Sequence, residues 1–268
     1  MASPRGRFAI LALFAALLAT LAASLPAQNP TERYIKDDNP VVEAEAAKGG
    51  KLWVLDFKFR DPRIIKVNIP GLGQRVCWYL WYQVINRTGE PRTFIPDFEL
   101  VTHDSKTPMV YRDQILPAAQ EAISRIEDPT GYYNIKNSVT IAKEPIPPTP
   151  PRSAPKAVTG VAIWIDPNES APTDDKAAKD IKEKLEKLAE SNRYSIFVAG
   201  LSNGWSLTDP VPPDTKHIVR RKTLQLTFRR LADKFSTRSE AIQFVPPVQW
   251  VYRASSTLDL KNPAKKDK

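Results

Sequence analysis

Residues 76–86 read VCWYLWYQVIN, and this stretch decides the fold. β-Branched and aromatic side chains dominate it, and these residue types favour extended backbone. Because successive side chains of a strand point to opposite faces, one face would carry Val76, Trp78, Leu80, Tyr82 and Val84, and the other Cys77, Tyr79, Trp81, Gln83 and Ile85. Both faces are largely apolar, which predicts a central strand that is covered on both sides.

Shorter runs of the same character recur on both sides of this stretch, separated by Pro, Gly, Asn and Asp. They are residues 51–59, 63–69, 93–95, 98–102, 109–114, 139–142, 157–165, 194–201, 218–231, 242–245 and 248–252. Two segments have helical spacing instead, residues 115–127, with Ile115, Ala119, Ala122, Ile123 and Ile126 on one face, and residues 174–191. Many strands and two helices predict a mainly β protein, an antiparallel sandwich decorated with two helices.

The N-terminus has the layout of a secretory signal peptide. Arg5 and Arg7 precede an apolar run over residues 8–23, and small residues and a proline follow at 24–27. We expect residues 1–27 to be a signal peptide that is cleaved after Ala27. The alternative is an uncleaved anchor, because residues 8–25 match the roughly 17–25 residues that a membrane-spanning helix needs. The predicted location is exported: periplasm, cell surface or extracellular space.

The rest of the chain divides by composition. Residues 28–50 are polar and predict a tether, residues 51–253 predict the sandwich domain, and residues 254–268 predict a basic disordered tail. Within the domain, the proline-rich segment 145–156 favours a polyproline II spacer, and residues 174–191 a helical insertion. Cys77 is the only cysteine, so no disulfide can form within the chain, and packing alone must hold the domain together.

Three phrases carry a resemblance to a known group. VINRTGEP at 84–91, TGVAIW at 159–164 and VAGLSNG at 198–204 together resemble immunoglobulin-like sandwich domains of exported bacterial proteins. The resemblance covers residues 51–253 in the order and spacing of patterns. It implies an immunoglobulin-like β-sandwich and an exported location, and it implies no catalytic residue. The helix at 174–191 and the strands after it depart from the group and leave a second small domain open.

The sequence does not match the residue patterns of common catalytic and metal sites. Residues 103–105 read HDS, but neighbours on one turn cannot form the nucleophile–base relay of a triad. His103 and His217 lack a third zinc ligand, and residues 166–169 lack the glycine and glutamate of a calcium loop. We therefore expect no catalytic residue, no metal and no cofactor. Paired carboxylates acting on a glycan stay open, because such acids can come from anywhere in the chain.

Positive charge marks the candidate binding residues. Lys and Arg number 39 against 30 Asp and Glu, which gives a formal net charge of +9. The predicted ligand-binding residues are Trp205, Trp250, Arg220, Arg221 and Lys222. The expected partner is an anionic envelope polymer or another envelope protein; nucleic acid is not expected, and membrane contact requires a retained N-terminal segment. The alternative is that these cations form only solvated surface.

These observations predict an exported, non-enzymatic structural or adhesive module that binds a ligand in the cell envelope. The motivating features are the signal layout, the strand-rich pattern and the failure of each catalytic template. The alternative is a carbohydrate-binding or carbohydrate-hydrolysing accessory domain.

Overall fold

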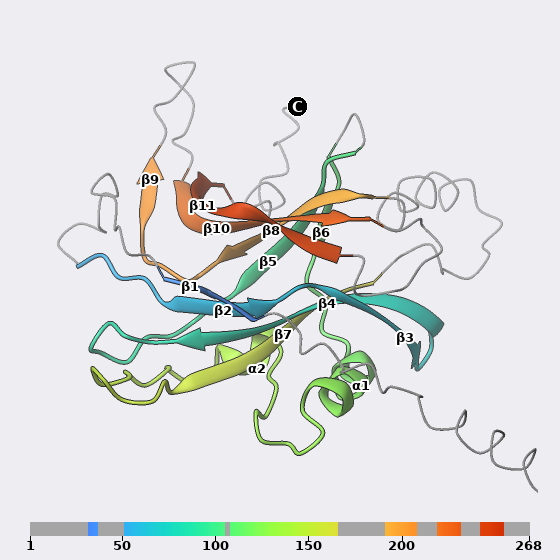
Figure 1. Ribbon diagram of the computed structural model, residues 1–268, viewed down its shortest axis with the longest axis horizontal. Helices are drawn as coiled ribbons and strands as arrows, with labels where there is room; N and C mark the ends of the chain where they lie inside the picture. The colour runs from blue at the N-terminus through green and yellow to red at the C-terminus, as the bar shows by residue number, and fades with distance from the viewer. Residues whose placement is uncertain are drawn as a thin grey trace, which may run out of the picture. The chain divides into compact units, whose positions relative to one another are not determined.

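The computed structural model describes residues 32–36, 51–104, 108–165, 191–207, 219–231 and 242–254. All of them belong to one compact unit, Thr31–Lys268. Two antiparallel sheets lie face to face (Figure 1). The mainly β prediction is confirmed. The predicted signal peptide, the segment 174–190 and residues 255–268 lie outside the described residues.

The five-stranded sheet is built around the stretch that opened the sequence analysis. Its strands are β1 (Glu32–Ile35), β2 (Asp56–Arg60), β3 (Arg63–Ile69), β4 (Gly73–Ile85) and β7 (Ala157–Ile165). β7 pairs along one edge of β4, while β2 and β3 share the other edge. β4 is therefore central, as predicted.

The six-stranded sheet has the order β11-β10-β8-β5-β6, with β9 paired to the start of β10. The strands are β5 (Asp97–Thr102), β6 (Val110–Arg112), β8 (Arg193–Ala199), β9 (Trp205–Leu207), β10 (Val219–Arg230) and β11 (Ile242–Arg253). We expected Pro246 and Pro247 to divide β11 into two strands. The strand instead continues through them, because they lie where the pairing register shifts and no ladder donor is needed.

Aromatic side chains fill the space between the sheets. Tyr82 of β4 lies with its ring centroid 5.5 Å from that of Phe57 and 4.8 Å from that of Phe98. Trp78 meets Tyr194 of the opposite sheet edge to face, at 5.5 Å. All five of these rings are buried. Both faces of β4 are therefore covered, as predicted: Trp78 and Tyr82 lie in the core between the sheets, and Cys77 is buried on the other face.

The outer face of the five-stranded sheet is covered by α1 (Pro117–Glu127), which packs on β3 and β7. The short helix α2 (Ser138–Ile141) lies against β7 and adds Ile141 to the core between the sheets. α1 begins later than predicted, because Pro117 suits the first helical turn. Ile126, expected to be buried, is 55% exposed, and Ile115 lies outside the helix; Glu127 is buried instead. Its carboxylate accepts hydrogen bonds from Arg60 and Tyr79, which fixes the end of α1 to the sheet. No helix in the described residues is long and apolar enough to cross a membrane.

Part of the expected tether is a strand. Residues 32–35 form β1, which pairs with β2, and Glu32 forms ion pairs with Lys58 and Arg60. Tyr34 donates a hydrogen bond to the buried carboxylate of Asp56. The tether prediction was wrong here because this short edge strand has no apolar run that would mark it in the sequence. Ion pairs and the tyrosine hydrogen bond hold it in place instead.

The first part of the proline-rich segment packs on the sandwich, whereas residues 150–156 are exposed. Ile146 is 1% exposed, and its backbone N–H and carbonyl both pair with the backbone of Arg92. The Asn86 amide donates to the Ile146 carbonyl at 2.8 Å, and the Thr149 N–H donates to the Asn86 carbonyl. Residues 146–149 pack here because prolines keep their carbonyl acceptors and because Ile146 supplies apolar surface to bury.

Candidate functional site

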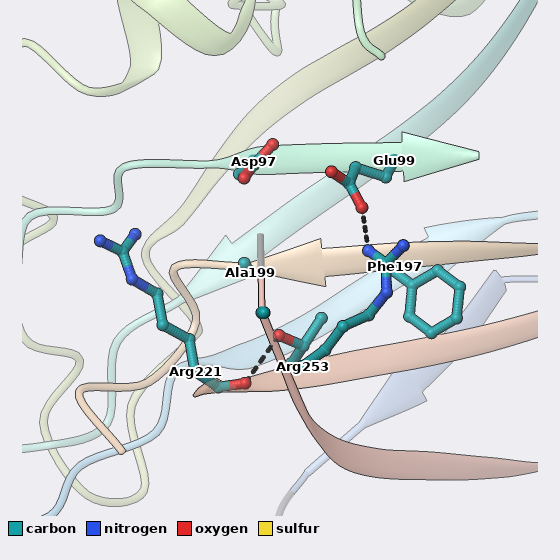
Figure 2. Close-up of a pocket in the computed structure, with 8 residues that line it drawn as sticks. Asp97, Glu99, Phe197, Ala199, Arg221 and Arg253 are labelled. Atoms are coloured by element: carbon teal, nitrogen blue, oxygen red, sulfur yellow. Dashed lines mark hydrogen bonds and ion pairs between the residues drawn. The ribbon is translucent and has the colours of Figure 1, made fainter. Parts of the chain in front are cut away.

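The outer face of the six-stranded sheet carries no helix among the described residues, and a shallow hollow lies on it (Figure 2). The hollow encloses about 250 Å³, counting space that is open to solvent. Its lining comes from β5, β8, β10 and β11: Asp97, Glu99, Phe197, Ala199, Arg221, Thr223, Arg253 and Ala254. Ala199 and Thr223, whose side chains are small, form the bottom of the hollow.

The side chain of Arg253 extends across this hollow, and its guanidinium group is held in place. Its guanidinium forms an ion pair with Glu99 and lies 4.2 Å from the centroid of the Phe197 ring (Figure 2). Glu99 is only 2% exposed, and its other carboxylate oxygen lies 3.8 Å from a guanidinium nitrogen of Arg112. Burial lowers the pKa of Arg253, and the nearby charge of Asp97 opposes that shift. The guanidinium of Arg253 is thus fixed in position, and its charge is already paired within the protein.

Arg221 has no such partner. It lies directly opposite Arg253 in the pairing of β10 with β11, yet its side chain points away from Arg253 (Figure 2). It is exposed and forms no ion pair with any residue that the structure describes. On the other edge of β10, Trp205 lies opposite Arg221, so the half-buried indole shares its face of the sheet. The structure therefore brings together two of the predicted binding residues, Arg221 and Trp205.

Comparisons of the chain with protein families, curated proteins and solved structures found no match.

The other predicted binding residues lie elsewhere. Lys222 and Trp250 point between the sheets: Lys222 is 4% exposed, and its ammonium lies 5.0 Å from the centroid of the Trp250 ring. Trp250 is half-buried and packs on the core. Arg220 is exposed, but strand alternation turns it away from the face that bears Arg221. The predicted set of five residues is thus divided between the two faces of β10 and β11.

Sequence reasoning did not select Glu99, Phe197 or Asp97. The signal was present, because Asp97 and Glu99 alternate with the buried Phe98 and Leu100, as acids do on one face of a strand. The two carboxylates are the acidic pair of the hollow. Glu99 is committed to two arginines and nearly inaccessible, so it is poorly placed to act as the proton donor that glycoside hydrolysis requires.

A serine and a histidine meet farther along the same face. Nε2 of His103 lies 2.8 Å from Oγ of Ser195, which is also 3.2 Å from Oγ1 of Thr227. Ser195 is fully buried, while a catalytic serine must touch its substrate. Burial, together with the charge of Arg193, lowers the pKa of His103. In this arrangement the pair is a structural hydrogen bond between β5 and β8.

The remaining candidates from the sequence are resolved in part. The carboxylate of Asp104 accepts backbone N–H groups of Asn192 and Arg193 and so serves a turn. Ser105, His217 and residues 166–169 lie outside the described residues. Within the described ranges, no three side chains of His, Cys, Asp or Glu gather closely enough to share a metal ion.

Proposed function

We propose that this chain is an exported, non-enzymatic binding module of the cell envelope, with immunoglobulin-like topology, that binds an anionic polymer at the hollow beside Arg221. Export rests on the signal layout of residues 1–27 and on the resemblance to exported domains. The binding role rests on the open sheet face described above.

The order of strands supports the immunoglobulin-like assignment. In such domains strands A, B and E share one sheet, and C′, C, F and G the other. Here β2, β4 and β7 are adjacent in one sheet, and β6, β5, β8 and β10 are adjacent in the other, each in the matching chain order. β11 is an additional strand beyond G. Antibody domains carry a disulfide between B and F, and Trp78 of β4 packs on Tyr194 of β8 in the corresponding pair of strands.

One observation carries the binding proposal: on the outer face of the six-stranded sheet, Arg221 is exposed, forms no ion pair with a described residue, and lies opposite the half-buried Trp205. A guanidinium binds a carboxylate or phosphate with two parallel hydrogen bonds, and the face of an indole accepts a flat apolar surface. Pockets for small molecules bury most of the ligand. The hollow beside Arg221 is too shallow for that, so we expect a ligand to lie across it, as one segment of a polymer would.

The experiment is a binding titration of the full chain with polygalacturonate at increasing salt. We expect the wild-type affinity to fall as salt rises, because salt screens exposed charges. Arg221→Glu should weaken binding at least tenfold. The control is Arg125→Glu, which makes the same charge change at an exposed position on α1, over the other sheet. Affinity that does not change with salt, or equal losses in the two variants, would contradict the proposal.

A further inference from the structure

The outer face of β10 carries a second pair of facing arginines. Arg229 lies directly opposite Arg193 of β8, just as Arg221 lies directly opposite Arg253 of β11. Arg221 and Arg229 are an even number of residues apart, so they share one face of the strand. At about 3.3 Å per residue, their separation of eight residues spans about 26 Å. The outward residues between the two pairs are Thr223, Gln225 and Thr227, all neutral; Thr223 is buried, and Gln225 and Thr227 are half-buried.

Both pairs retain a positive excess. Like charges directly opposite each other on a sheet are destabilising, and Arg193 and Arg229 are both exposed, with no ion pair to a described residue. Asp104 is the carboxylate at that end, and it accepts the backbone N–H of Arg193. At the other end, Arg221, Arg253 and Arg112 face two carboxylates, those of Glu99 and Asp97, which leaves one positive charge. An extended anion lying on this face could pair with the excess charge at both ends.

We propose that the ligand is a linear, carboxylate-bearing polysaccharide that lies along β10 and contacts both arginine pairs. This inference rests on the proposed function and adds the length and direction of the site. Trp205 beside Arg221 offers a face for a sugar ring, and the half-buried side chains of Gln225 and Thr227 between the pairs add no charge that would repel the carboxylates. Single-stranded nucleic acid is usually bound on a row of aromatic side chains. The outward positions of β10 between the two pairs carry no aromatic residue.

The test uses oligogalacturonates of defined length and the full chain. We expect affinity to rise with length until the oligomer spans about 26 Å, the distance between the two arginines on β10, and then to level off. Arg229→Ala should weaken binding of the long oligomer about fivefold, as loss of one exposed ion pair does, and lower the slope of log affinity against log salt by about one. It should leave a trimer unaffected. Arg125→Ala is the matched control and should change neither value.

Each outcome separates this inference from the proposal beneath it. If Arg221→Glu binds as the wild type does, the binding site itself is wrong. If Arg221→Glu weakens binding while Arg229→Ala does not, and affinity is independent of oligomer length, the binding site stands. Only the inference that the polymer lies along β10 is then overturned. Single-stranded DNA of equal length that binds as tightly would overturn the polysaccharide assignment. Urea unfolding checks each variant, and we expect Arg229→Ala to be at least as stable as the wild type because it relieves a like-charge pair.

Discussion

Neutralising Glu99 should lower stability and raise affinity for the polymer at the same time. This carboxylate is 2% exposed and lies between two guanidinium groups, those of Arg112 and Arg253. In Glu99→Gln one side-chain oxygen remains as an acceptor, but the amide N–H₂ must face the second guanidinium. Arg253 then loses its ionic partner while its position over Phe197 is kept.

The magnitude follows from the contacts. Losing one charge-assisted hydrogen bond costs about 1.5–3 kcal/mol. Part of this is offset, because the buried carboxylate no longer has to be desolvated. A net loss of about 1–2 kcal/mol lowers the melting temperature by about 3–6 °C in a domain of this size. With Arg253 released, affinity for an anionic polymer should rise about threefold to tenfold, which corresponds to about 0.7–1.4 kcal/mol.

The assay pairs urea unfolding, followed by fluorescence of the buried tryptophans, with polygalacturonate binding. Glu121→Gln is the matched control, because that carboxylate is exposed and pairs only with Arg125 on α1. We expect the control to stay within about 0.5 kcal/mol of the wild type. A Glu99→Gln variant that is as stable as the wild type and binds more weakly would refute the reasoning.

Two further predictions concern the fold. In Gly160→Ala the new Cβ would lie 2.4 Å from the ring of Tyr82, which is fully buried and cannot move aside; we expect a loss of about 1–3 kcal/mol in urea unfolding, and wild-type stability would contradict the packing. Burial raises the pKa of Asp113 to about 6, although its carboxylate accepts the Ile163 N–H at 2.7 Å. Because the unfolded chain then releases this proton at lower pH than the folded one, stability should fall as pH rises from about 4 to 6. Asp113→Asn, which keeps the acceptor for Ile163, should flatten that part of the pH profile, and an unchanged slope would assign the effect to other groups.

The core could be predicted from the sequence because hydrophobic pattern determines it. The alternation in residues 76–86 predicted the central strand β4 with both faces covered, and the run at 157–165 matches β7 from end to end. Which face points between the sheets could not be predicted, because both are apolar. Burial of apolar surface is the dominant favourable term in folding, and it acts on residue type alone.

The candidate site depends on register, which a single sequence does not specify. Arg221, Arg253 and Trp205 meet because β10 pairs with β9 and β11 at particular residues. Strand alternation exposes Arg221 and turns Lys222 inward. Basic residues that are adjacent in the sequence therefore do not form one basic surface. β1 was missed for a related reason, since its partner strand supplies the charges that hold Glu32.

The most direct test of the account is to follow the side-chain Nε–Hε signals of the arginines by NMR while polygalacturonate is added. We expect the signals of Arg221 and Arg229 to shift together along one saturating curve, while that of Arg125 on α1, over the five-stranded sheet, stays in place. Shifts confined to arginines over the five-stranded sheet, or none at saturating polymer, would contradict the claim that the outer face of the six-stranded sheet binds an anionic polymer.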